Sequence, residues 1–239
     1  MASVFVVGAK GRMGRLLCAA VEAAEGLELA GGYDVDNASE LDEAAAAVDL
    51  VIDFSRPASL PHVEAYVRRT HAALLSGTTG FSADELARIG ALGDVAPVVW
   101  ASNYSLGVAV LKRLSAIAAE ALADFDIEIV ETHHNQKADA PSGTAKTLLE
   151  AVDPDGACEV AYGREGITGV RPKRQIGMHA LRGGTVAGTH EVHFFGQDEE
   201  VTLTHRATSR QIFVNGAIAC AKRLVGRAAG LYTVDDLLF

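Results

Sequence analysis

The chain has few cysteines and lacks long apolar runs, and each shortage excludes a class of protein. Its three cysteines, Cys18, Cys158 and Cys220, lie far apart, and no C-x-x-C pair occurs. Neither a disulfide framework nor a thiolate zinc site is therefore expected. No apolar run approaches the roughly 18 residues that a membrane-spanning helix needs.

Basic residues are also scarce relative to acidic ones. Lys and Arg number 21 against 31 Asp and Glu, which gives a formal net charge of -10. This balance argues against a nucleic-acid or anionic-membrane partner, although a local basic pocket is compatible with it. The N-terminus enters a strand pattern at once and shows no signal-peptide layout. We therefore expect a cytoplasmic protein that binds neither nucleic acid nor membranes.

What the chain does have is enough apolar material for a substantial core. Hydrophobic residues make up 49% of its 239 residues, so general disorder is not expected. This length accommodates one large domain or two modest ones.

The chain begins with the pattern of a dinucleotide-binding unit. Residues 4–7 are wholly apolar, which is typical of a strand buried on both faces. They lead into G-A-K-G-R-M-G at Gly8 to Gly14, and an amphipathic helix follows to about Ala24. Strand, glycine loop and helix in this order are the context that a dinucleotide fingerprint requires, whereas glycines alone indicate only a tight turn.

An acidic residue supports the dinucleotide interpretation. A second strand, 28–33, ends at Asp34, about 20 residues after the last glycine of the loop, where an acidic side chain binds the ribose hydroxyls. Lys10 stands where the commonest fingerprint has its second glycine.

Strands and helices continue to alternate, which predicts a parallel, doubly wound sheet. Ser82 has the position of a helix N-cap, with Glu85 as its capping-box partner. The strands should end at Gly8, Phe54, Gly77 and Ala101 along one ligand-binding edge. The further strands are predicted at 50–54, 72–76 and 95–101, with a helix at 60–70.

Beyond Leu106 the pattern changes to that of an α+β domain with a mixed sheet. The region 157–184 is rich in Gly and Arg and is expected to include a long loop. Strands at 185–195 and 200–207 alternate apolar and polar residues, as antiparallel strands do. The other elements predicted here are helices at 106–122, 143–151 and 212–225, a strand at 126–131 and a turn at 196–199.

These patterns predict an α/β protein with two domains. The first is a Rossmann-type, doubly wound parallel sheet at 1–104, joined by the C-terminal helix and tail at about 212–239. The second, 105–211, is a substrate-binding and oligomerisation domain.

One segment combines proton donors with a predicted helix N-terminus. Glu131 to Lys146 reads E-T-H-H-N-Q-K-A-D-A-P-S-G-T-A-K. Histidine and lysine side chains move or stabilise protons, and the backbone N–H groups of a helix start can hold a carboxylate. This combination suits a small anionic substrate. The alternative is a polar surface loop, but loops that carry so many functional side chains tend to carry function.

A metal site is a second interpretation of the same histidines. Adjacent histidines point in different directions unless the backbone bends, so we expect no metal site. The more distant histidines are expected to be structural or surface residues. The candidate ligands considered are His133, His134, Asp139, His179, His190 and His193.

Six motifs together resemble the 4-hydroxy-tetrahydrodipicolinate reductase family, which acts in the diaminopimelate route to lysine. The resemblance covers essentially the whole chain, and its most specific motif is E-T-H-H-N-Q-K-A-D-A-P-S-G-T-A. The supporting motifs are G-A-K-G-R-M-G, G-T-T-G at 77–80, A-S-N-Y-S at 101–105, L-R-G-G at 181–184 and H-R-A-T-S-R at 205–210.

The resemblance implies a role for individual residues. His133 matches the family's proton donor or acceptor, and Lys137 matches its proton-donating lysine. His134, Ser142, Gly143 and Thr144 match contacts to the substrate carboxylate. The cofactor site is matched by Gly8, Ala9, Lys10, Gly11, Arg12, Met13, Asp34, Gly77, Thr78, Thr79, Ala101, Ser102, Asn103 and Tyr104.

The family's chemistry agrees with the interpretation from the residues. Its substrate is a cyclic dicarboxylate with an imine, from which water is lost before a hydride from a nicotinamide cofactor reduces the conjugated system. A nearby cationic His or Lys would stabilise the developing charge and supply a proton.

The residues after Asp34 depart from the pattern of many family members, which have an arginine suited to the phosphate of NADP. Here Val35 and Asp36 follow, and the nearby cations are Lys10, Arg12 and Arg15. Because Asp34 repels a 2′-phosphate and these cations offset the repulsion, we expect NADH and NADPH both to be used, with NADH at least as good.

Two other functions remain open from the sequence. One is another two-domain nicotinamide oxidoreductase, for example one that acts on an amino-acid semialdehyde; the D-A-P-S-G-T segment argues against it. The other is a non-catalytic dinucleotide sensor, which loss of His133 or Lys137 would favour, and both are present. The resemblance further implies a homotetramer, and the alternating strands at 185–195 and 200–207 are candidates to pair across subunits.

Overall fold

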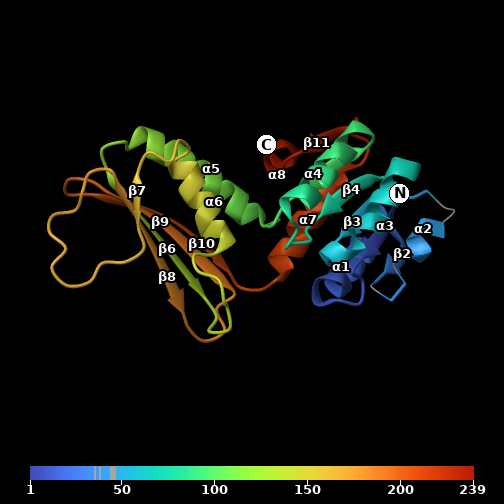
Figure 1. The fold of residues 1–239 in the computed structure, drawn as a ribbon, viewed down its shortest axis with the longest axis horizontal. Helices are drawn as coiled ribbons and strands as arrows, with labels where there is room; N and C mark the ends of the chain where they lie inside the picture. The colour runs from blue at the N-terminus through green and yellow to red at the C-terminus, as the bar shows by residue number, and fades with distance from the viewer. Residues whose placement is uncertain (35, 38, 44–46) are drawn as a thin grey trace. The chain divides into compact units, whose positions relative to one another are not determined.

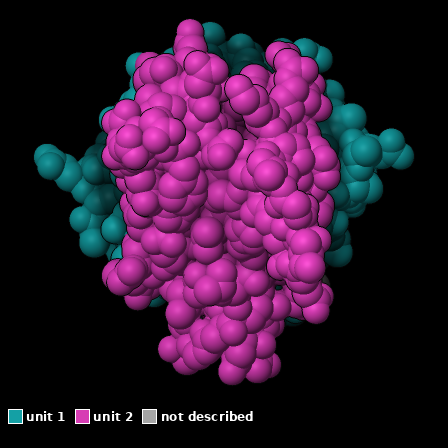
Figure 2. All heavy atoms as spheres, turned by 90° about the vertical axis from the view of Figure 1, so that its left-hand side faces the viewer, with its two compact units in different colours: residues 1–106, 211–239 teal, residues 107–210 magenta. Residues whose placement is uncertain are grey.

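The computed structural model describes residues 1–34, 36–37, 39–43 and 47–239. Within it the chain forms two compact units, distinguished by colour in Figure 2. Unit 1 comprises 1–106 with 211–239, and unit 2 comprises 107–210.

Unit 1 is built on a parallel sheet (Figure 1), and the predicted doubly wound fold is confirmed. Among the described residues the strand order is β11-β5-β4-β3-β1-β2, and every pairing is parallel. The strands are β1 (Ala2–Val7), β2 (Leu27–Tyr33), β3 (Leu50–Asp53), β4 (Ala73–Ser76), β5 (Pro97–Trp100) and β11 (Gly230–Tyr232).

Helices cover both faces of this sheet, so its central strands are buried throughout. The helices α1 (Arg12–Ala23), α7 (Gln211–Leu224) and α8 (Val234–Leu238) share one core with the sheet. The second core contains buried residues of α2 (Glu40–Glu43), α3 (Leu60–Thr70) and α4 (Ala83–Ala91), together with Leu92 of the short 3₁₀ turn Leu92–Asp94. Another 3₁₀ turn, Pro57–Ser59, precedes α3.

The predicted start of α4 is confirmed in detail. The hydroxyl of Ser82 accepts the N–H of Glu85 at 3.3 Å, and the Glu85 carboxylate accepts the N–H of Ser82 at 2.7 Å. This reciprocal capping box satisfies two backbone donors that the helix itself leaves unpaired.

Unit 2 is an α+β unit with a mixed sheet in the order β10-β9-β6-β8-β7 among the described residues. Strand β6 pairs parallel with β8 and antiparallel with β9, while β9 and β10 are antiparallel. The strands are β6 (Asp126–His133), β7 (Glu159–Ala161), β8 (Gln175–Arg182), β9 (Gly188–Phe195) and β10 (Glu200–Ala207).

Two helices lie on the same face of this sheet (Figure 1). The helices α5 (Leu106–Ala121) and α6 (Gly143–Val152) enclose a core with the alternate side chains of β6, β8 and β9. Its fully buried members include Ile129, Leu148, Val192 and Phe194.

The region 157–184 does include a long loop, 162–174, as expected, but it also contains β7 and the whole of β8, which were not predicted. Ile176 and Met178 are buried against the helices, whereas Gly177 and His179 alternate with them on the other face. Two apolar residues separated by glycine and histidine are too weak an alternation to identify a strand from sequence. The three-residue β11 in the C-terminal tail is also not predicted, because it is too short to show an alternation.

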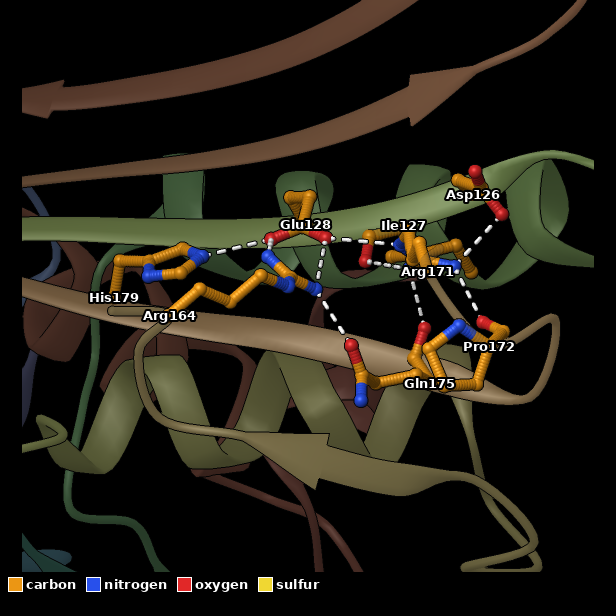
Figure 3. Close-up of polar contacts among 8 residues, drawn as sticks. All are labelled: Asp126, Ile127, Glu128, Arg164, Arg171, Pro172, Gln175 and His179. Carbon is orange, nitrogen blue, oxygen red and sulfur yellow. Dashed lines mark hydrogen bonds and ion pairs between the residues drawn. The ribbon is translucent and has the colours of Figure 1, made fainter. Parts of the chain in front are cut away.

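The second face of the sheet carries a network of charged side chains (Figure 3). The carboxylate of Glu128 accepts hydrogen bonds from Arg164 at 3.0 and 2.9 Å and from Arg171 at 3.2 Å, and it lies 2.7 Å from Nε2 of His179. Burial alone would raise the pKa of Glu128, but these partners lower it to about 2. A Cβ on Gly177 would lie 1.7 Å from Oε2 of Glu128, so only glycine leaves room for the network.

The strands that are candidates to pair across subunits, β9 and β10, direct apolar side chains into the core of their own unit. Val192 and Phe194 are buried under the unit's own helices. Val201 and Leu203 also pack against that core.

None of the helices that the structure describes is long and apolar enough to cross a membrane.

Candidate functional site

The glycine loop of unit 1 opens onto a pocket of about 180 Å³. Among its lining residues, Gly8, Gly11 and Asp34 are predicted cofactor residues, and Phe54 is a predicted strand end at the ligand-binding edge. The other lining residues follow Phe54 and were not predicted; they are Ser55, Arg56, Ala58 and Ser59. The pocket lies at the carboxyl ends of parallel strands, where open α/β sheets bind ligands.

Two glycines of this loop are required by close backbone contacts. Gly8 has φ of +85°, and a Cβ there would lie 2.4 Å from the carbonyl oxygen of Phe54. A Cβ on Gly14 would lie 1.9 Å from the carbonyl oxygen of Gly8. The first glycine therefore permits the turn and the second permits the start of α1 to pack against it, so backbone can approach a phosphate closely.

Asp34 lies directly against the loop. Its carboxylate accepts the backbone N–H of Lys10 at 2.9 Å, while its own N–H donates to the side-chain oxygen of Asn37 at 2.7 Å. The ammonium of Lys10 forms an exposed ion pair with Asp36. The acidic residue and the glycine loop are thus held together, as ribose recognition beside a pyrophosphate requires.

The remaining predicted cofactor residues connect the ends of neighbouring strands. The hydroxyl of Thr78 accepts the N–H of Ser55 at 2.8 Å, and its carbonyl accepts the indole N–H of Trp100 at 2.9 Å. The hydroxyl of Tyr104 donates to the carbonyl of Ser76 at 2.8 Å. These bonds connect the loops after β3, β4 and β5. The loop after β4 contains Gly77 and Thr79, and the loop after β5 contains Ala101, Ser102 and Asn103.

In unit 2 the helix-covered face of the sheet becomes polar where β6 ends. Glu131 is fully buried there, and each of its carboxylate oxygens accepts two hydrogen bonds. One oxygen accepts from Arg182 at 2.7 Å and from the N–H of Ser142 at 3.0 Å. The other accepts from Arg182 at 2.8 Å and lies 2.6 Å from Nδ1 of His133. Burial alone would raise the pKa of Glu131, but the bonds from Arg182, His133 and Ser142 lower it.

His133 is oriented by this carboxylate. Since Nδ1 faces Glu131, the ring presents Nε2 on its other side, next to Gly188 of β9. A Cβ on Gly188 would lie 3.1 Å from that Nε2. The glycine therefore leaves the second ring nitrogen open to a ligand.

His190 lies beside His133, with ring centroids 5.2 Å apart in an edge-to-face arrangement. Its Nε2 is 3.0 Å from the hydroxyl of Ser142, the N-cap of α6, and that hydroxyl also accepts the N–H of Ala145 at 3.2 Å. Burial lowers the pKa of His190 to about 4, and the charges of His133, His205 and Lys137 act in the same direction.

The other predicted residues lie in the loop after β6 and in the first turn of α6. Lys137 forms an ion pair of 2.8 Å with Asp139, and its N–H donates to the carbonyl of His134 at 3.2 Å. Gly143 and Thr144 occupy the first turn of α6, where backbone N–H groups lack helical acceptors. A half-buried lysine, a histidine and a helix N-terminus thus converge at one end of the sheet.

Sequence reasoning missed Arg182, Gly188 and His190 as parts of this cluster. His190 is paired in register with Glu131 across β9 and β6, so both point to the same face. Alternation along β9 with Val192 and Phe194 was a signal that could have found it. Arg182 belongs to the strand that was interpreted as loop, so no register was available for it.

The histidines considered as metal ligands do not meet in one place. His179 is bonded to Glu128, and His193 lies 3.0 Å from the hydroxyl of Thr202 and 3.2 Å from Glu200. Within the described residues no three His, Cys, Asp or Glu side chains are arranged to hold a metal ion.

A doubly wound parallel sheet with a glycine loop, in a chain that also has a second unit with a mixed sheet, is the fold class of two-domain nicotinamide-dependent oxidoreductases. Two family models, described as "Dihydrodipicolinate reductase, N-terminus" and "Dihydrodipicolinate reductase, C-terminus", match residues 2–104 and 107–238. The chain belongs to this family, and it is an oxidoreductase of the diaminopimelate route to lysine that reduces 4-hydroxy-tetrahydrodipicolinate.

Curated relatives match over the full chain. The 4-hydroxy-tetrahydrodipicolinate reductase of Syntrophotalea carbinolica is 40% identical and is matched over 100% of this chain and 99% of its own. Those of Anaeromyxobacter sp. and Akkermansia muciniphila are each 43% identical over 100% of this chain and 98% of their own.

Solved structures share the fold. The dipicolinate-bound dihydrodipicolinate reductase from Paenisporosarcina sp. TG-14 matches with a TM-score of 0.78 and 22% identity, covering 98% of this chain and 97% of its own. The DAP dehydrogenase of C. glutamicum matches with a TM-score of 0.59 and 13% identity over 100% and 95%.

The contribution of the Glu131 charge to stability can be tested by substitution. Glu131→Gln keeps the side-chain shape but removes the charge that Arg182 and His133 face. The free energy of unfolding at pH 7 should fall by about 1.5–3 kcal/mol, the range for a hydrogen bond to a charged group. Because the folded-state pKa is depressed, wild type holds this stabilisation above its unfolded pKa of about 4.5 and loses it as the pH falls further.

The measurement is urea unfolding by circular dichroism at a series of pH values from 7 to 3. The single tryptophan, Trp100, lies in unit 1, so its fluorescence separately monitors the unit without the substitution. The exposed Glu150→Gln on α6 is the matched control and should follow wild type. Parallel pH curves for wild type and Glu131→Gln would contradict the prediction.

Proposed function

We propose that unit 1 binds the nicotinamide dinucleotide and unit 2 binds the cyclic dicarboxylate and supplies protons. The observation that carries the proposal is the buried Glu131, which holds His133 beside the N-terminus of α6. In this proposal the glycine loop contacts the pyrophosphate, Asp34 accepts bonds from the adenosine ribose, and the loops at 77–79 and 101–104 line the rest of the cofactor site.

The substrate carboxylate is assigned to the start of α6. The N–H groups of Gly143 and Thr144, with the hydroxyl of Ser142, can donate to its oxygens, and the helix dipole favours its charge. His134 adds a further contact. Dipicolinate, bound in the related Paenisporosarcina enzyme, is a planar dicarboxylate of the same class, and we expect this chain to bind it too.

Proton donation is assigned to His133 and Lys137. Glu131 holds Nδ1 of His133, so Nε2 is the atom that gives or takes a proton. Lys137 is part-buried and paired with Asp139, which keeps an ammonium close to the site. The bound dinucleotide supplies the hydride; the side chains of this chain orient the ring, stabilise the charge that develops away from the hydride and donate the proton.

We expect NADH to be used at least as well as NADPH. Asp34 repels a 2′-phosphate, and Lys10, whose backbone N–H donates to the Asp34 carboxylate, is already paired with Asp36 through its ammonium. A dual-cofactor assay, with substrate generated in situ by the preceding synthase, tests both the reaction and this preference. Oxidation of neither cofactor would reject the reaction, and NADPH preferred by more than about tenfold in kcat/KM, or about 1.4 kcal/mol, would reject the preference alone.

The assigned roles predict different kinetic effects for three variants. His133→Ala should lower kcat by roughly 10²-fold or more, the usual scale for a positioned acid. Lys137→Ala should lower kcat to a similar extent. His134→Ala should act mainly on KM, since its contact is present in both ground and transition states.

Steady-state kinetics and NADH titration on these variants decide the assignment. NADH binding should survive in all three, because the proposed cofactor site is on unit 1. The exposed Lys146→Ala on α6 is the control for charge removal and should remain near wild type. Near-normal kcat in His133→Ala would remove His133 from the mechanism, and loss of NADH binding in all three would mean that the sites are misassigned.

We further propose a cytoplasmic homotetramer that assembles through the sheet of unit 2. The polar face with Glu128, Arg164 and Arg171 is the available surface there, since the apolar face is covered by α5 and α6. Light scattering at micromolar concentration should give a mass near four chains of 25.0 kDa. A monomer under these conditions would contradict it.

A further inference from the structure

The hydroxyl of Ser142 has two close neighbours inside the protein. The N–H of Ala145 donates to its oxygen at 3.2 Å, and Nε2 of His190 lies 3.0 Å away. Ser142 is 2% exposed. A hydroxyl has one proton and two acceptor positions, so the proton on His190 decides which way the Ser142 proton can point.

His190 is neutral in this environment and therefore carries one ring proton. It is 4% exposed, and burial, followed by the charge of His133, lowers its pKa to about 4. Its Nδ1 is buried and has no hydrogen-bond partner among the described residues. If Nδ1 carried the proton, a buried N–H would be left without an acceptor, which is rarer in proteins than an unused acceptor.

The favoured tautomer consequently has the proton on Nε2, which donates to Ser142. Both acceptor positions of the Ser142 hydroxyl are then occupied, one by Ala145 and one by His190. Its own proton is left to donate outward, at the N-terminus of α6. With the opposite tautomer, Ser142 would donate into the ring of His190 and would offer a ligand no proton.

We propose that His190 is a positioning residue that fixes the Ser142 hydroxyl as a hydrogen-bond donor to the substrate carboxylate. This inference rests on the proposed function, which places that carboxylate at the start of α6. In this role His190, on β9, acts through Ser142 and does not contact the reacting atoms.

The tautomer can be measured directly on the wild-type protein. Nitrogen-15 NMR with labelled histidine distinguishes a protonated from an unprotonated ring nitrogen, and the His190 signals are identified by their loss in His190→Phe or His190→Gln. The expected result is a protonated Nε2 and an unprotonated Nδ1. The reverse pattern would overturn the inference, and one folded variant is enough to assign the signals, whether or not it is active.

Kinetics then separate positioning from a merely structural role. His190→Phe should raise the KM for substrate and the Kd of dipicolinate by about five- to tenfold, with a smaller change in kcat, as expected for one weakened bond to a charged group. His190→Gln, whose amide can donate from nearly the same place as Nε2, should restore most of the loss, whereas His190→Asn, which is shorter, should not.

A double-mutant cycle completes the test. In a Ser142→Ala background, His190→Phe should cause no further loss of dipicolinate binding, because its effect passes through the hydroxyl. Additive losses, or equal effects of Gln and Asn at position 190, would overturn the inference. An inactive wild-type enzyme would instead reject the proposed function, so the two failures are distinguishable.

Discussion

The fully buried carboxylate of Glu131 is the interaction on which the arrangement of unit 2 depends. A charge removed from water is tolerated only when it is paired and fully hydrogen-bonded. Here the four bonds come from three places in the chain: Arg182 on β8, His133 at the end of β6 and the N–H of Ser142 at the start of α6. Satisfying one carboxylate therefore fixes the end of a strand, its neighbour and the helix that follows.

Two neighbouring histidines of this cluster have different polar partners. His133 faces Glu131 directly, whereas His190 faces a hydroxyl and is kept neutral by burial, with its pKa lowered to about 4. Two imidazoles with ring centroids 5.2 Å apart thus have different surroundings, as the different roles proposed for them require. Neighbouring titratable groups whose surroundings differ in this way are a common feature of enzyme sites.

The sequence predicted the parts of this protein that depend on local pattern. The alternation of strands and helices, the glycine loop, Asp34 and the capping box of α4 were all recognisable, because each is specified by residues close together in the chain. Elements that depend on distant partners were not. Strand β8 was interpreted as loop because Gly177 and His179 interrupt its apolar residues, and they are there to accommodate Glu128 of the neighbouring strand.

The residues of the candidate site also divide into those that a local pattern predicts and those that depend on distant partners. His133, Lys137 and the start of α6 lie in one contiguous segment, so the sequence brought them together. Arg182 and His190 join them only through the register of β6 with β8 and β9, which no local pattern reveals. Arg56 of the unit 1 pocket was missed because it lies in a loop whose position is set by the end of β3.

The division of the chain has a consequence for biosynthesis. Unit 2 is one continuous segment, 107–210, whereas unit 1 needs 211–239 to be complete. That last segment provides α7, whose side chains from Val214 to Leu224 are part of the core around α1, and β11, which pairs with β5. On the ribosome, unit 2 can therefore emerge complete while the first hundred residues still lack α7 and α8 from one layer over their sheet. Part of one face of the nascent parallel sheet remains uncovered until 211–239 have been made, so that interval is when this chain most needs protection from aggregation.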